Sequence, residues 1–250
     1  MYLGFSAAAR CDWQVVWEHL QAMQAAQTSP QSTIPKTLAL LAKYLSGVYA
    51  QGTGDLDTAL EIFQDSKLDI SIAKGLPADA ASKMQRDLAL LANLNALWIL
   101  QEPSRLDTTY NTSVLADLEP LCKSHANKEI STAFWLTKMF VVTNPPERQF
   151  MIKNYLVTAS NGASRTGNTQ LSTYFLSIAH HLFWKDTVGD QALKSARSAV
   201  VQANKSGNKL WMSVANGMLS ENFNAHGDSQ AAAAAREEAI KNTIEAMPKQ

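Results

Sequence analysis

Two adjacent histidines, His180 and His181, are the side chains best suited to chemistry in this chain. Imidazoles bind zinc and transfer protons near neutral pH, so a pair of them is a first candidate for a metal or catalytic site. Consecutive residues of a helix point about 100° apart, which prevents the two rings from holding one ion. No Cys, Asp or Glu follows four residues later to supply another ligand. We therefore predict no metal site and interpret both histidines as packed or surface-lining side chains.

Two glycine-containing stretches have some of the features of ligand-binding loops. Residues 52–54 (Gly-Thr-Gly) lack a third glycine, a preceding strand and a following Lys-Ser/Thr, so they are not a phosphate-binding loop. Residues 162–167 are one residue too long for a nucleophile elbow and connect two expected helices. We find no catalytic constellation, predict that the protein is not an enzyme, and expect no cofactor.

Six tryptophans could form a stacking surface for nucleic-acid bases, but their positions favour a structural role. Trp13, Trp17, Trp98 and Trp135 lie on helices that are apolar on one face or more, so we expect them in the core. In the expected helix 12–26 the inner stripe is Trp13, Val16, Trp17 and Leu20.

The composition is that of an ordinary folded protein. Of 250 residues, 46% are hydrophobic and 18% charged, and the formal net charge is zero, so no bulk attraction to nucleic acid or an anionic membrane is expected. The two cysteines, Cys11 and Cys122, are far apart and belong to no motif, which indicates a reducing compartment and not a disulfide framework. No apolar run has the ~18 residues of a membrane span.

The stretch from Leu40 to Ser66 is the most informative part of the chain. It predicts two helices joined by a tight turn, with Asp55 capping the second helix. Gly47 and Ala59 are small enough to let the helices approach closely, and Phe63 fills the wedge beyond them. This spacing is typical of a tetratricopeptide-type repeat, a unit that needs neighbours to bury its apolar stripe.

Further helices are expected along the whole chain. They span about 80–100, 112–124 (with Pro120 kinking or dividing it), 129–142, 145–159, 169–184, 190–203, 208–224 and 228–247, whereas 71–78 and 160–168 are expected as loops. Gly-Asp pairs at 54–55, 189–190 and 227–228 each stand where one helix of a pair ends and the next begins. We therefore predict an all-α, TPR-like helical-repeat superhelix (an α-α solenoid), a single array over 1–250 closed by a capping helix at 228–247.

Four stretches carry a family resemblance: YLSGVYAQGTGDLDTALEIF (44–63), STAFWLTKMF and ERQFMIKNYLVTASN within 131–161, LSIAHHLFW (176–184), and the Ala-rich ending 209–246. In this order they resemble the C-terminal portion of the MAU-type cohesin-loading subunit, the tetratricopeptide-repeat partner in the cohesin loader. The resemblance implies a nuclear, non-enzymatic scaffold that holds an extended N-terminal segment of the large HEAT-repeat loader subunit. Cohesin and chromatin would be indirect partners, and the N-terminal repeats of the family would be missing from this chain.

Two other functions remain open. One is a helical-repeat adaptor, such as a module of a fungal transcription regulator, and the other is a direct nucleic-acid binder. The second would use residues 185–209, which contain five basic and two acidic side chains.

Repeat geometry suggests which residues contact a partner, because the first helix of each pair lines the concave side. The predicted partner-binding residues are Tyr44, Gln51, Tyr174, His181, Trp184 and Asn224. Their mixed polar and aromatic character suits an extended peptide. The alternative, which the sequence leaves equally open, is that they contact neighbouring repeats.

Overall fold

The computed structural model describes residues 7–8, 12–28, 36–75, 80–123, 125–141, 167, 169–179 and 190–247, and every regular element among them is an α-helix. In chain order these are α2 (Trp13–Thr28), α3 (Lys36–Thr53), α4 (Leu56–Phe63), α5 (Ile70–Gly75), α6 (Ala80–Ile99), α7 (Thr108–Cys122), α8 (Lys128–Val141), α10 (Thr169–Ala179), α11 (Asp190–Ser206), α12 (Lys209–Ala225) and α13 (Ser229–Ala246). The all-α prediction is confirmed.

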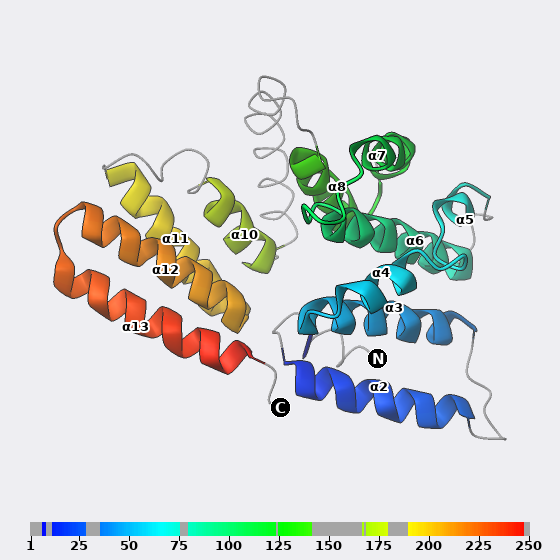
Figure 1. Cartoon of the computed structure of the whole chain (residues 1–250), viewed down its shortest axis with the longest axis horizontal. Helices are drawn as coiled ribbons and strands as arrows, with labels where there is room; N and C mark the ends of the chain where they lie inside the picture. Colours follow the sequence, from blue (N-terminus) through cyan, green and yellow to red (C-terminus); the bar gives the residue numbers. More distant parts are fainter. Residues whose placement is uncertain are drawn as a thin grey trace. The chain divides into compact units, whose positions relative to one another are not determined.

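The helices belong to two compact units (Figure 1), each considered by itself: Met1–Ala8 with Trp13–Ala159, and Ala9–Asp12 with Ser160–Gln250. Helices that follow each other in sequence pack together in both units, as α3 does with α4 in the first and α12 with α13 in the second. This pairing is consistent with a helical repeat. The single array over 1–250 and the capping role of 228–247 stay predictions.

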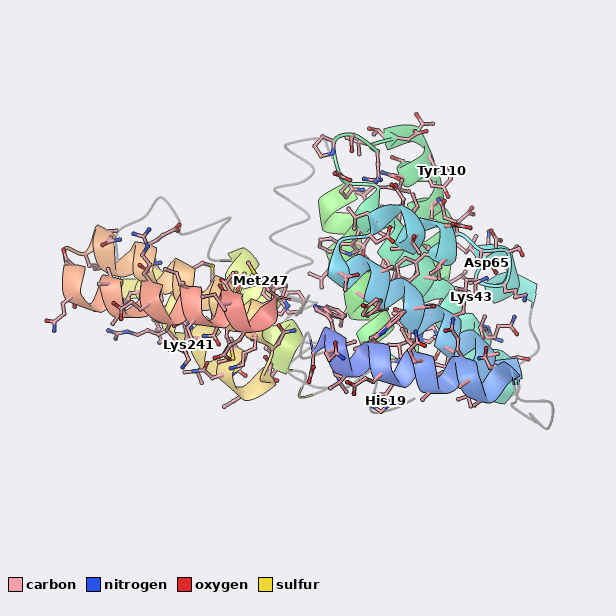
Figure 2. All side chains as sticks on the ribbon, turned by 60° about the horizontal axis from the view of Figure 1, so that its bottom comes forward. His19, Lys43, Asp65, Tyr110, Lys241 and Met247 are labelled. Carbon is pink, nitrogen blue, oxygen red and sulfur yellow. The ribbon has the colours of Figure 1, made fainter. Side chains whose placement is uncertain are left out.

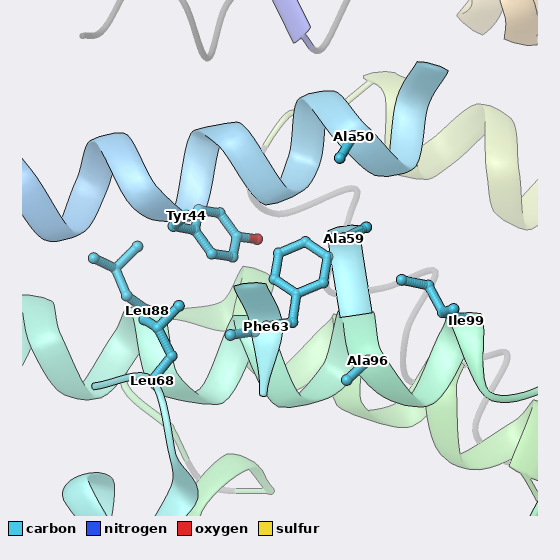
Figure 3. Close-up of a cluster of buried hydrophobic side chains, with 9 residues drawn as sticks. Tyr44, Ala50, Ala59, Phe63, Leu68, Leu88, Ala96 and Ile99 are labelled. Carbon is cyan, nitrogen blue, oxygen red and sulfur yellow. The ribbon is translucent and has the colours of Figure 1, made fainter. Parts of the chain in front are cut away.

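The hairpin of α3 and α4 packs as its residue types predict. Ala59 and Phe63 are buried in the core of the first unit, where the Phe63 ring lies 5.7 Å from that of Tyr44 (Figure 3). A Cβ atom added to Gly47 would lie 2.7 Å from the edge of the Phe63 ring. Only glycine therefore fits at this crossing, as the close approach of the two helices requires.

Two of the Gly-Asp turns are visible, and both act as expected. Gly54 and Gly227 have φ values of 90° and 78°, in the left-handed region that glycine enters without strain. Asp55 and Asp228 then accept hydrogen bonds from the backbone N–H groups of Thr58 at 3.2 Å and Ala231 at 3.0 Å. A chain reversal and an N-cap are thus built from one dipeptide. Gly189 lies outside the described residues, as does the predicted helix 145–159.

Three local predictions are wrong. The expected loop 71–78 contains helix α5 at Ile70–Gly75, because the Asp69 carboxylate accepts a hydrogen bond from the Ser71 N–H at 2.7 Å and starts a helical turn. Helix α7 begins at Thr108, four residues before the expected start, where Asp107 caps it; of the two effects expected of Pro120, the division of the helix does not occur. Trp17 is 44% exposed instead of buried, and its ring stacks on that of Tyr49 with the centroids 5.4 Å apart.

Candidate partner-binding surface

Tyr44 lies in the core of the first unit. Its side chain is 8% exposed, and its hydroxyl accepts a hydrogen bond from Asn95 Nδ2 at 2.8 Å. Burial raises the pKa of Tyr44 to about 12, since the phenolate would be poorly solvated there. These contacts give Tyr44 a packing role between α3 and α6, and its predicted partner contact stays a prediction.

Two other predicted partner-binding residues have described, accessible side chains. Gln51 is half-buried near the end of α3 in the first unit, and Asn224 is exposed near the end of α12 in the second. Tyr174 belongs to α10, but its side chain lies outside the described residues. His181 and Trp184 also lie outside them.

Asn224 is one end of a continuous strip on α12. Spacings of four and three residues place the strip on one side of the helix. We define the α12 strip by its members: Leu210, Val214, Gly217, Glu221 and Asn224. Leu210 is 48% and Val214 38% exposed, and a Cβ atom added to Gly217 would meet no atom within 4 Å. The strip is therefore apolar at its first end, small and open in its middle, and polar at its last end.

The side of α12 opposite the strip packs against the neighbouring helices, which leaves the strip at the surface. Ala215, Asn216, Ser220 and Asn222 are buried there. Two of the buried amides find their hydrogen-bond acceptors within α12. Asn216 Nδ2 and Asn222 Nδ2 donate to the carbonyl oxygens of Met212 and Met218, each at 2.8 Å. Helix α12 is thus anchored by α11 and α13 and presents the remaining strip outward.

Sequence reasoning missed the aliphatic side chains near this strip. Helix α13 buries small residues (Ala232, Ala235 and Ala239), yet Ile240, Ile244 and Met247 are 52%, 66% and 61% exposed. Their spacing of four and three residues is a recognisable signal on a helix whose buried side is already occupied by alanines. The exposed side of this helix therefore carries an apolar stripe.

Helix α11 carries part of the basic segment considered for nucleic acid. Its outer side lines a hollow of about 500 Å³ with Lys194, Arg197 and Val201 among the lining residues. The Arg197 guanidinium lies 5.5 Å from the centre of the Phe223 ring on α12, and Lys209 pairs with Glu245 at 2.6 Å. Two of the described cations therefore contribute to packing within the unit, which weakens the case for a phosphate-binding stripe.

Groups that could carry chemistry are few in the part of the chain that the structure describes. No cluster of three or more His, Cys, Asp or Glu side chains that could hold a metal occurs among these residues. Cys122 is fully buried, and burial raises the pKa of its thiol to about 12, far from a reactive thiolate. No helix within the same ranges has both the length and the apolar character needed to cross a membrane.

Comparison with known protein families identifies the family to which this helical chain belongs. The model of the cohesin loading factor family matches residues 1–230. Comparisons with curated proteins and with solved structures found no match. The family is non-catalytic, and membership implies a role in cohesin loading within a loader complex. Because the match covers nearly the whole chain, this protein belongs to the cohesin loading factor family.

Proposed function

We propose that the chain is a scaffold subunit of the cohesin loader, which holds an extended N-terminal segment of the large HEAT-repeat loader subunit. The observation that carries this proposal is the family match over residues 1–230. A scaffold of this kind would work in the nucleus and promote cohesin loading onto chromatin and sister-chromatid cohesion. Cohesin and chromatin would then be reached through the large subunit.

The described surface offers groups suited to an extended peptide. Gln51 and Asn224 each carry an amide that can donate and accept hydrogen bonds, which matches the unpaired N–H and C=O groups of an extended backbone. A net contribution of about 1 kcal/mol for one such hydrogen bond corresponds to roughly a fivefold change in affinity. Removing a single amide should therefore weaken a complex measurably without abolishing it.

Co-purification tests the proposal directly. The chain is co-expressed with the N-terminal segment of the large loader subunit, and the complex is isolated and measured by calorimetry. We expect a stable complex, with Asn224→Ala weakening it about fivefold. Asn204→Ala is the matched control, since Asn204 is an exposed asparagine on α11, away from the α12 strip. Absence of any complex would refute the proposal, and equal effects of the two substitutions would remove Asn224 from the surface.

The predicted residues outside the described ranges have their own test. His181→Ala combined with Trp184→Ala should weaken partner binding while the chain stays folded by circular dichroism. Unchanged affinity of the folded double variant would exclude these two side chains from the interface. Capture of a transcription regulator in place of the large loader subunit would favour the adaptor function, and a steep loss of DNA affinity with salt would favour the nucleic-acid function.

A further inference from the structure

The outer side of α4, in the first unit, carries a stripe of exposed polar side chains. Its members are Asp57, Glu61 and the C-cap residue Gln64, spaced by four and three residues along the helix. Residues 54–66, which contain this helix, include four carboxylates and no basic side chain. The stripe is therefore acidic, although the formal net charge of the whole chain is zero.

Two contacts tie this stripe to residues 105–110, which lead into the first turn of α7. At the first end of the stripe, the Arg105 guanidinium donates to Asp57 Oδ1 at 2.5 Å. At its last end, Gln64 Nε2 donates to the Tyr110 hydroxyl at 3.4 Å. The two segments therefore lie side by side and run in the same direction, with 57–64 alongside 105–110.

The place of Glu61 follows from these two contacts. Because Asp57 and Gln64 both reach toward residues 105–110, Glu61, which lies between them on the same stripe, is on the side of α4 that faces this segment. Residues 106–109 are Leu-Asp-Thr-Thr and offer no cation. Within the part of the chain that the structure describes, the Glu61 carboxylate has no hydrogen bond or ion pair. Its charge is therefore left without a partner between the two contacts.

The cations at the two ends of the stripe are already engaged. Arg105 bonds to Glu102 in addition to Asp57, so its guanidinium bridges two carboxylates. Beyond the other end, Lys43 of α3 pairs with Asp65 (Figure 2). Neither of these cations is therefore available to neutralise the carboxylate in the middle.

Two large side chains next to this carboxylate are also exposed. Leu106 is 45% and Tyr110 43% exposed. Asp107 accepts a hydrogen bond from the Tyr110 N–H at 2.9 Å and caps α7, which holds both side chains in one turn. We define the Glu61 surface by its members: Glu61, Leu106 and Tyr110. It combines an unpaired carboxylate with an aromatic ring and an aliphatic side chain.

The charge of this surface decides what it can bind. A divalent cation is a poor occupant, since no group of three or more His, Cys, Asp or Glu among the described residues could hold a metal. An acidic stripe repels nucleic acid and anionic lipid. A Lys or Arg side chain fits, because its charge complements Glu61, its cation can lie over the Tyr110 ring, and apolar atoms beside it can cover Leu106.

We propose that the Glu61 surface binds a basic peptide segment of a partner protein, with an arginine or lysine between Glu61 and the Tyr110 ring and an aliphatic residue over Leu106. This interaction goes beyond the proposed scaffold function, because it recognises side-chain charge and not an extended backbone. None of its three residues belongs to the partner-binding set predicted from the sequence.

Fluorine NMR of the full chain labelled with 3-fluorotyrosine tests the proposal at the surface itself. The probe is a short peptide in which arginines alternate with leucines. The matched peptide has citrulline in place of each arginine, which keeps the shape of the side chain and removes its charge. We expect the arginine peptide to shift the Tyr110 signal, which is assigned by its loss in Tyr110→Phe, and to leave the signal of buried Tyr44 unchanged.

Substitutions distinguish a defined site from general attraction between charges. Affinity is measured by fluorescence anisotropy of the labelled arginine peptide near physiological ionic strength, where distant charges are screened. Glu61→Gln should weaken binding about threefold. Glu237→Gln, at an exposed position of α13 in the second unit, changes the net charge equally and should leave the affinity unchanged.

The aromatic ring has a separate pair of variants. Tyr110→Ala removes the ring and should weaken binding about threefold. Tyr110→Phe keeps the ring, loses only the hydrogen bond from Gln64, and should bind as the unaltered chain does. Because the side chains of Glu61 and Tyr110 are exposed, these changes should leave the chain folded, which circular dichroism checks.

Four results would overturn the proposal: no shift of the Tyr110 signal with the arginine peptide, equal shifts with the citrulline peptide, equal losses of affinity for Glu61→Gln and Glu237→Gln, or self-association of the free chain that Glu61→Gln abolishes. The last result would mean that a second copy of the chain occupies the surface.

Discussion

Replacing Gly47 with alanine should destabilise the first unit, although the same change at Gly217 should stabilise the second. Both glycines lie inside helices, α3 and α12, where alanine is intrinsically favoured by about 1 kcal/mol. Their surroundings differ. A Cβ atom at position 47 would lie 2.7 Å from Phe63 Cε1 and 3.0 Å from Ile62 Cγ2, whereas at position 217 it would meet no atom within 4 Å.

The size of the effect follows from how firmly the Phe63 ring is held. The ring is 1% exposed and packs against Tyr44, so it cannot swing away from the new methyl group. Overpacking of this kind costs about 1–3 kcal/mol, and the helix propensity of alanine offsets about 1 kcal/mol of it. We expect a net loss of up to about 2 kcal/mol for Gly47→Ala and a gain of up to about 1 kcal/mol for Gly217→Ala.

Native-state hydrogen exchange is the appropriate assay, because it reports the opening free energy of α3 and α12 separately. A double-mutant cycle with Phe63→Leu adds a direct test of the contact. The shorter side chain should relieve the clash, so the two changes should couple by at least about 1 kcal/mol. If Gly47→Ala stabilises α3 as much as Gly217→Ala stabilises α12, the Phe63 ring does not lie against Gly47 and the reasoning is wrong.

Three further predictions concern caps and titrating groups. Asp228→Ala should destabilise the first turn of α13 by about 1 kcal/mol and Asp228→Asn by less, as measured by hydrogen exchange. The hydrogen bond from Lys43 and the Lys67 N–H hold the pKa of Asp65 below its ordinary value of 3.8, so this carboxylate stabilises the fold above that pH and loses its contribution as the pH falls through its folded pKa. Burial raises the pKa of Cys122 from 9.0 to about 12, so stability should fall as the pH rises from about 9 toward 12.

Each of these has a control. Ser229→Ala, next to the cap but outside it, should leave α13 unchanged, and an equal loss there would contradict the cap assignment. Asp65→Asn should flatten the acid limb of the stability curve, and an unaltered limb would show that Lys43 and Asp65 do not interact. Cys122→Ser, measured between pH 9 and 12, should remove part of the alkaline loss, and a thiol reagent should react with native Cys122 only as fast as the chain opens.

The fold was predictable where local chemistry and tertiary packing agree. The hairpin of α3 and α4 carries its own glycine, cap and apolar stripe, and the Gly-Asp turn at 227–228 repeats the same arrangement. These signals fix a helix pair without reference to distant residues. They do not fix helix starts that depend on a single polar side chain, and so Asp69 and Asp107 produced helical turns that periodicity alone did not predict.

Burial was harder to predict than helix position. Trp17 matches an apolar stripe with Val16 and Leu20, yet the side of α3 that faces it offers Tyr49, on which Trp17 stacks while remaining partly exposed. Tyr44 shows the reverse case, because this polar aromatic residue on a first helix is buried. Asn95, more than fifty residues away in sequence, supplies the hydrogen bond that allows its burial.

The same difficulty explains why the exposure of Ile240, Ile244 and Met247 escaped the sequence analysis. The sequence of α13, rich in alanine and charged residues, favours a compact helix with a polar exterior. On that pattern alone, Ile240, Ile244 and Met247 would be expected on its buried side. The register of α12 against α13 reverses that assignment, because Ser213 with Thr243 and Ser220 with the Ala232 carbonyl turn the alanines inward. Alanines occupy the inward positions, and Ile240, Ile244 and Met247 are exposed. The hydrogen bonds that set the rotation of α13 are therefore accompanied by the exposure of these aliphatic side chains.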